Sequence, residues 1–87
     1  MKHRATRRFW KCFQRLPDSV KEVAREKFEL LEKDPNHPSL HFKEIGVFWS
    51  VRITLFYRAL AIKDGEDLVW VWIGTHEDYG RMLKSSA

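Results

Sequence analysis

The sequence predicts an α+β domain, with an N-terminal helical hairpin packed on an antiparallel sheet of about four strands and a short C-terminal helical tail. Apolar residues recur at helical spacing up to about Lys33, and after Pro38 the period changes to the alternation that is typical of strands. Helices that precede strands with short connections favour an antiparallel sheet covered by helices on one face. With 87 residues, of which 44% are hydrophobic, residues 1–87 are expected to form a single domain with one packed core.

Two helices are predicted before the strands. The first covers about 6–16 and ends at Pro17, because proline lacks the amide hydrogen that a helix interior needs. Ser19 and Glu22 have the spacing of a capping box, in which the serine hydroxyl accepts from the amide three residues on and the glutamate reaches back. The second helix is expected to run from there to about Lys33, where two prolines prevent its continuation.

The later segments are predicted as strands followed by a tail. We expect strands over 40–45, over 47–54 with one side buried, and over 57–63. Residues 68–73 are apolar on both faces, which favours a central strand. Residues 77–84 are predicted to form the short amphipathic tail.

The formal net charge of +4 is unevenly distributed along the chain. No acidic residue precedes Asp18, and the segment before it carries six bases, namely Lys2, Arg4, Arg7, Arg8, Lys11 and Arg15. Such a basic end favours a nucleic-acid or acidic-protein partner. A solvated helix face that keeps the protein soluble explains the cluster equally well.

Cys12 is the only cysteine, so the chain can form no intrachain disulfide and offers no zinc site. No apolar run is long enough for a signal peptide or a membrane-spanning segment. We therefore expect a cytoplasmic protein that uses no metal or other cofactor and does not bind a membrane.

An ordered set of short motifs extends over nearly the whole chain, and it comprises Arg8-Phe-Trp, Leu16-Pro, Asp34-Pro-Asn-His-Pro-Ser-Leu40, Phe42-Lys43, Trp49-Ser-Val-Arg52, Tyr57-Arg58-Ala59 and Ile73-Gly-Thr-His76 with Tyr79. This set resembles the RelE/ParE superfamily, the toxin halves of bacterial type II toxin–antitoxin modules. The resemblance implies a helical hairpin on a curved antiparallel sheet, and a cognate antitoxin that wraps over the toxin. Many members begin with a β-strand, but residues 1–5 are short and basic, so we expect no strand there.

The resemblance implies one of two activities. RelE-like members cleave mRNA in the ribosomal A site with the ribose 2′-hydroxyl as nucleophile, whereas ParE-like members inhibit DNA gyrase and cleave nothing. The histidine near the C-terminus is similar to that of subfamilies such as YafQ and HigB, which favours a metal-independent mRNA endonuclease with mRNA and the ribosome as partners. The alternatives are a ParE-like gyrase inhibitor and a degenerate toxin fold that only binds other proteins.

Cleavage through the 2′-hydroxyl needs proton transfer and positive charge on the phosphate. His76 is the candidate catalytic acid or base, since an unperturbed imidazole titrates at about pH 6.5. Arg52 and Lys43 are expected to neutralise the phosphate, and Tyr79 to orient the substrate. Each residue also has a structural explanation: a surface histidine, an arginine or lysine paired with an acid, and a packed tyrosine.

Arg58 and His41 are the further candidates for substrate binding. Arg58 suits a phosphate, although it could equally be a structural arginine beside Tyr57. His41 is predicted to share a side of its strand with Lys43 and is a candidate second proton carrier, or else an ordinary exposed residue.

Trp70 and Trp72 are predicted to project to one face of their strand, because they are two residues apart. On a surface they would form a stacking platform or part of an antitoxin groove. Beneath the helices they would simply be core residues.

Overall fold

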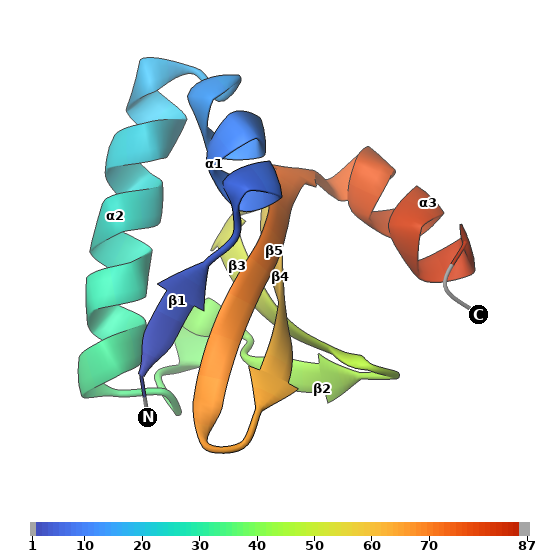
Figure 1. The fold of residues 1–87 in the computed structure, drawn as a ribbon. Coiled ribbons are helices and arrows are strands. Elements are labelled where there is room, and N and C mark those ends of the chain that lie inside the picture. Colours follow the sequence, from blue (N-terminus) through green and yellow to red (C-terminus); the bar gives the residue numbers. More distant parts are fainter. Residues whose placement is uncertain (1, 86–87) are drawn as a thin grey trace.

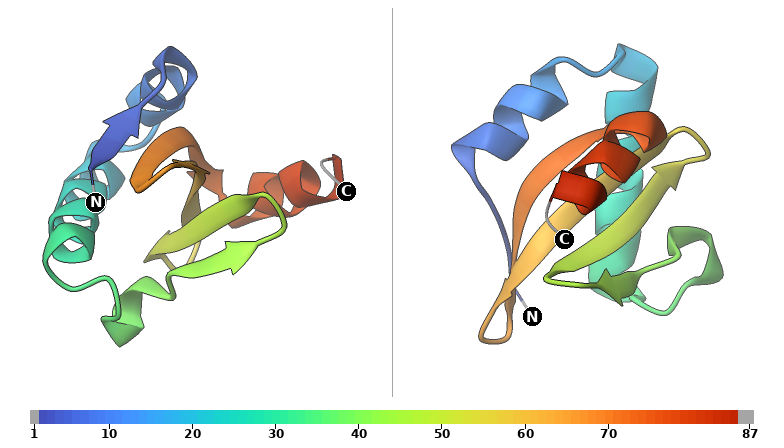
Figure 2. Two further views of the ribbon diagram at one scale, coloured as in Figure 1. Left: turned by 60° about the horizontal axis from the view of Figure 1, so that its bottom comes forward. Right: turned by 90° about the vertical axis from the view of Figure 1, so that its right-hand side faces the viewer.

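The computed structural model describes residues 2–85 and has a mixed α+β architecture (Figure 1). Within these residues a five-stranded sheet is covered by two helices on one face, and a third helix lies against the other face (Figures 1 and 2). In chain order the elements are β1 (His3–Ala5), α1 (Arg7–Gln14), α2 (Asp18–Lys33), the 3-10 turn η1 (Pro38–Leu40), β2 (Lys43–Ile45), β3 (Phe48–Thr54), β4 (Tyr57–Asp64), β5 (Asp67–Thr75) and α3 (His76–Ser85).

The strands lie in the order β1-β5-β4-β3-β2, and neighbours are antiparallel except for β1, which runs parallel to β5. The first strand shows that our expectation of no strand in residues 1–5 was wrong. Its pairing is continued by the amide of Thr6, which donates to the carbonyl of Trp70 at 3.0 Å. Arg4 points outward, and its Nη2 lies 2.6 Å from Oδ2 of Asp64. Pairing with β5 thus stabilises a strand that the sequence of the short basic segment did not indicate.

Helix α2 has the predicted extent but a different start. Its N-cap is Pro17, whose carbonyl accepts from the amide of Lys21 at 3.0 Å, and no side chain caps the helix. Ser19 therefore lies inside the first turn, and the predicted capping box of Ser19 and Glu22 is wrong. Asp18 in the first turn places a negative charge near the positive end of the helix dipole instead.

Only the second half of the segment 40–45, which was expected to be a strand, forms one. Leu40 is fully buried and ends η1, where its amide donates to the carbonyl of His37 at 3.1 Å. His41 then has φ of 45°, in the left-handed region, so the chain turns there before β2 begins at Lys43. The burial of Leu40 and the turn at His41 prevent regular alternation before Lys43.

The main core lies between the sheet and the two N-terminal helices. It is made by Phe9, Phe13, Leu16, Ala24, Leu31, Leu40, Val51, Ile53, Ala59, Ala61, Leu68, Trp70 and Ile73. Five aromatic rings from α1, α2 and β5 contact one another within it or at its margin, which gives this small domain a large buried area without a disulfide.

A β-bulge in β5 separates the two tryptophans that we expected on one face. Trp70 pairs with Ala61 and Trp72 with Leu60, so two residues of β4 are matched by three of β5. Trp70 therefore packs on Phe28 of α2, with ring centroids 4.9 Å apart, as part of the main core. Trp72 is also buried but lies with Leu60 on the opposite face.

Helix α3 begins at His76 and confirms the predicted tail. The amide of His76 donates to the carbonyl of Phe56 at 2.7 Å, and the hydroxyl of Thr75 accepts from the amide of Asp78 at 3.2 Å. In the right-hand view of Figure 2 this helix crosses in front of the sheet while α2 lies behind it. The turn between β3 and β4 is thus joined directly to the start of α3.

Candidate functional site

The sheet face turned away from α1 and α2 carries three of the predicted site residues. In the register of β3 and β4, Arg52 lies directly opposite Arg58. In the register of β2 and β3, Lys43 lies opposite Ser50, two residues before Arg52. Since cross-strand partners and residues two apart share a face, all three cations project to the same side.

His41 and Arg52 are in contact at this face. Nη1 of Arg52 lies 3.1 Å from Nε2 of His41. A guanidinium can only donate, so Nε2 of His41 accepts and carries no proton in this arrangement. The left-handed turn at His41 is what brings its ring to Arg52, eleven residues further along the chain.

Arg58 is held by the backbone of the turn between β3 and β4. Its Nη1 donates to the carbonyl oxygens of Thr54 at 2.6 Å and Tyr57 at 3.1 Å. Burial, followed by the nearby charge of Arg52, lowers the pKa of Arg58, and Tyr79 opposes this shift. Because the carbonyl contacts all use Nη1, the Nε and Nη2 groups can still donate to a phosphate.

Tyr79 and His76 complete the site from the first turn of α3. Their rings are stacked, with centroids 5.8 Å apart and an interplanar angle of 29°. His76 is exposed and Tyr79 is half-buried, and Tyr79 lies close enough to Arg58 to influence the pKa of that guanidinium. Stacking of this kind fixes the orientation of the imidazole without removing it from solvent.

Five predicted residues therefore form a continuous series of neighbours: His41, Arg52, Arg58, Tyr79 and His76. We call this series, together with Lys43, the candidate site. Lys43 is placed on the same face by strand register. The six predicted site residues thus lie on one face of the sheet or at its edge.

The sequence reasoning missed the apolar floor of this face. Trp72 is 7% exposed and lies against Gly74, where an added Cβ would be 2.5 Å from Cζ2 of the indole. A cavity of about 210 Å³ adjoins this floor beneath the start of α3, lined in part by Tyr57 and Asp78. The signal available in the sequence was Gly74 two residues after Trp72, which marks a close approach of side chain and backbone.

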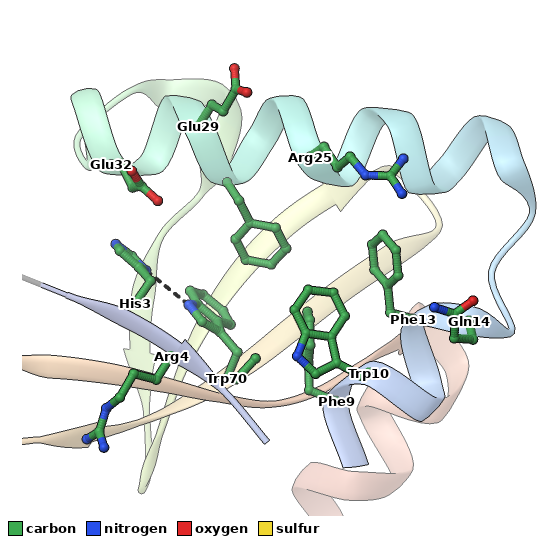
Figure 3. Close-up of a pocket in the computed structure, with 12 residues that line it drawn as sticks. His3, Arg4, Phe9, Trp10, Phe13, Gln14, Arg25, Glu29, Glu32 and Trp70 are labelled. Carbon is green, nitrogen blue, oxygen red and sulfur yellow. Dashed lines mark hydrogen bonds between the residues drawn. The ribbon is translucent and has the colours of Figure 1, made fainter. Parts of the chain in front are cut away.

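A larger cleft lies elsewhere, between β1, α1 and α2, and contains none of the candidate site (Figure 3). It has a volume of about 610 Å³, and its walls include Phe9, Trp10 and Phe13. At one end the indole Nε1 of Trp70 donates to Nδ1 of His3 at 3.0 Å. Nε2 of His3 is buried without a hydrogen-bond partner among the described residues, and burial lowers the pKa of this imidazole.

Within residues 2–85, no three His, Cys, Asp or Glu side chains come together as a metal site would require. No helix in the same range is long and apolar enough to cross a membrane.

Solved structures with this architecture define the class of protein. A chain of the RelB–RelE antitoxin–toxin complex from Methanococcus jannaschii matches with a TM-score of 0.72 and 12% identity, over 91% of this chain and 96% of that chain. The YoeB/ParE toxin from Agrobacterium tumefaciens matches with a TM-score of 0.67 and 20% identity, over 87% and 99%. The isolated RelE toxin of E. coli gives 0.63 and 15%, over 99% and 98%. At these identities the likeness shows the fold, which is that of the RelE/ParE toxins.

The family follows from the sequence itself. The model of the ParE-like toxin domain matches residues 18–81, which is more than half of the chain. This chain belongs to the ParE-like toxin family. A comparison with curated protein sequences gives no match.

Proposed function

We propose that this toxin is a metal-independent endonuclease that cleaves mRNA on the ribosome in the cytoplasm and so inhibits translation. The observation that supports the proposal is the candidate site itself. Two guanidiniums, an ammonium and an imidazole on one face of the sheet lie with an imidazole and a phenol from α3, the helix on that face. A fold needs no such set of cations on one face, whereas a phosphodiester does.

The reaction assigned to the site is attack of the ribose 2′-oxygen on the neighbouring phosphorus. A base removes the 2′-hydroxyl proton, Arg52 and Lys43 neutralise the phosphate oxygens as charge develops, and an acid gives a proton to the leaving 5′-oxygen. The bond from phosphorus to the 5′-oxygen breaks, leaving a 2′,3′-cyclic phosphate and a free 5′-hydroxyl. Every step uses side chains of this protein and the substrate alone.

His76 and His41 are the groups able to move these protons. His41 accepts from Arg52 in the free protein, so its Nε2 lone pair becomes available when a phosphate takes over that guanidinium donor. His76 is exposed at the other end of the series, with its ring oriented by Tyr79. We assign His76 as the main acid or base, Tyr79 to orienting the substrate, and Arg58 and His41 to substrate binding.

The test is to induce the chain alone in cells and follow growth, translation and the 5′ ends of cellular mRNA, with His76→Ala and His41→Ala beside it. Arrest with new mRNA ends that carry 5′-hydroxyls, lost in His76→Ala, is the expected result. His76→Ala is expected to lower the cleavage rate by about 10²–10⁴-fold, the factor that one acid or base usually supplies. If His76→Ala cleaves mRNA and arrests growth as the parent does, the assignment is wrong.

The family name supports a second candidate, because the matching model describes ParE-like toxins. In that case the basic surface binds DNA gyrase and no bond is cleaved. Supercoiling by purified gyrase separates the two candidates: inhibition by the toxin with cellular mRNA intact supports the gyrase inhibitor. If the induced chain does not arrest growth and the purified chain does not inhibit gyrase, the remaining candidate is a toxin fold that only binds other proteins.

A cognate antitoxin is the proposed protein partner. The Methanococcus jannaschii structure contains a toxin and its antitoxin in one complex. We expect this chain to be held inactive by an equivalent partner, and co-expression with that antitoxin should restore growth.

A further inference from the structure

The turn between β3 and β4 exposes two large apolar side chains. Phe56 is 69% exposed and Leu55 is 61% exposed. They are the two residues of the turn and follow one another directly in the chain. An aromatic side chain in this position contributes little to the core, and adjoining exposed apolar residues of this size indicate a binding surface.

This turn is held in one conformation. Arg58 donates from Nη1 to the carbonyl of Thr54 at 2.6 Å, and the amide of Phe56 donates to Oγ1 of Thr54 at 3.1 Å. The carbonyl of Phe56 in turn accepts from the amide of His76 at 2.7 Å. An exposed ring on a turn fixed at both ends loses little conformational freedom when it binds.

The same bonds place Phe56 at the edge of the candidate site. His76, its partner through the backbone, is stacked on Tyr79, and Arg58 lies opposite Arg52. The right-hand view of Figure 2 shows the turn between β3 and β4 beside the first turn of α3. The turn that carries the exposed ring of Phe56 therefore lies beside the candidate site.

We propose that Phe56 stacks on an unpaired base of the RNA next to the phosphodiester held by Arg52 and Lys43. This inference rests on the proposed endonuclease function and adds a base-binding residue to it. Proteins that hold single-stranded RNA combine a cationic surface along the backbone with aromatic rings that stack on the bases. The juxtaposition of Phe56 with Arg52, Arg58 and the His76–Tyr79 pair has both parts. An apolar segment of a protein partner would use Phe56 but would gain nothing from the adjoining cations.

The inference is tested by single-turnover cleavage of a defined mRNA on ribosomes, with the full chain. Two substrates are compared: the intact RNA, and RNAs in which the base on either side of the scissile phosphate is replaced by an abasic residue. Loss of one stacked base is worth about 5- to 150-fold, so Phe56→Ala should lower kcat/KM by this factor on intact RNA. On the abasic RNA that lacks the stacked base, Phe56→Ala and the wild type should cleave equally fast.

Two variants control for structure. Phe56→Trp keeps an aromatic face and should retain the wild-type kcat/KM, whereas Phe56→Leu keeps only an apolar side chain and should lower kcat/KM about as far as Phe56→Ala does. Val47→Ser changes another exposed apolar residue, 70% exposed on the turn between β2 and β3, and should leave the rate unchanged.

Each other outcome overturns the inference. Equal losses by Phe56→Ala on intact and abasic RNA would assign Phe56 a structural role in placing His76. Wild-type cleavage by Phe56→Ala, with weaker antitoxin binding, would make the tip a protein-docking surface while leaving the endonuclease function intact. Failure of the wild type to cleave any RNA, with or without ribosomes, would instead remove the proposed function and this inference together.

Discussion

Arg52 and Arg58 lie directly opposite each other on neighbouring antiparallel strands, with their guanidiniums on the same face of the sheet. Like charges in this position destabilise a sheet, and the charge of Arg52 contributes to the lowered pKa of Arg58. The pair is therefore a feature that the fold tolerates rather than one that it needs. Such a pair marks a surface built to receive an anion.

Replacing Arg52 should separate stability from activity. We expect Arg52→Gln to raise the free energy of unfolding by about 0.2–1 kcal/mol, since the repulsion disappears, and to abolish toxicity. Urea unfolding at low salt and at 0.5 M salt measures the first effect, which should shrink at high salt because the repulsion is screened. Growth on induction measures the second.

Arg58→Gln is the matched control for this prediction. It removes the same like-charge pair but also the bonds from Nη1 to the carbonyls of Thr54 and Tyr57. Hydrogen bonds to charged groups contribute about 1.5–3 kcal/mol, so this variant should be destabilised. Equal stabilities for the two variants would show that the turn does not depend on Arg58.

The position of the Trp72 indole is predicted to require glycine at residue 74. A Cβ at residue 74 would lie 2.5 Å from Cζ2 of an indole that is only 7% exposed, so the ring would have to move. Overpacking of this kind costs about 1–3 kcal/mol, and Gly74→Ala should lower the free energy of unfolding by that amount. Adding Trp72→Phe, which removes the clashing atom, should make Gly74→Ala nearly neutral in a double-mutant cycle. Additive effects of the two substitutions would contradict the close contact.

The sequence predicted the elements that depend on local chemistry. Helix α2 ends at Lys33 as expected, because the prolines that follow act on their own segment. The tail over 77–84 was recognised from its apolar spacing and is the helix α3. The six candidate residues were chosen for side chains that suit a phosphodiester, and the structure places them on one face of the sheet or at its edge. Their roles stay a prediction.

What could not be predicted depends on partners distant in the chain. The bulge that separates Trp70 from Trp72 exists only in the pairing of β5 with β4. Strand β1 forms by pairing with β5, so the sequence of this three-residue basic segment did not predict it. The contact of His41 with Arg52 depends on a left-handed residue that regular alternation would have excluded.

Helix capping offers a prediction with a built-in comparison. Oγ1 of Thr6 accepts from the amide of Phe9 at 3.1 Å and caps α1, whereas Ser19 makes no cap for α2. Thr6→Ala should therefore cost about 1 kcal/mol, and Ser19→Ala should change stability by less than about 0.5 kcal/mol. Chemical unfolding of the two variants decides the matter. A larger loss for Ser19→Ala would mean that the capping box read from the sequence forms in solution after all.

The stability of the protein should fall below neutral pH in a way that depends on His3. Burial lowers the pKa of His3 in the folded protein from the ordinary value of 6.5, while Glu32 partly opposes the shift. As the pH falls through about 6.5 the unfolded chain takes up a proton that the folded chain does not. The stabilisation is therefore complete above that pH and is lost as the pH falls towards the lowered pKa.

His3→Asn isolates this contribution. The Oδ1 of asparagine can replace Nδ1 of His3 as the acceptor for the indole of Trp70, now 3.0 Å away, but it does not titrate. The unfolding midpoint of the wild type should drop more steeply than that of His3→Asn between pH 7.5 and pH 5, at about constant ionic strength. The two proteins carry the same other titratable groups, so the difference between the curves belongs to His3 and its interaction with Glu32. Parallel curves would show that the His3 ring is solvated, and that the bond from Trp70 does not hold β1 in its buried position.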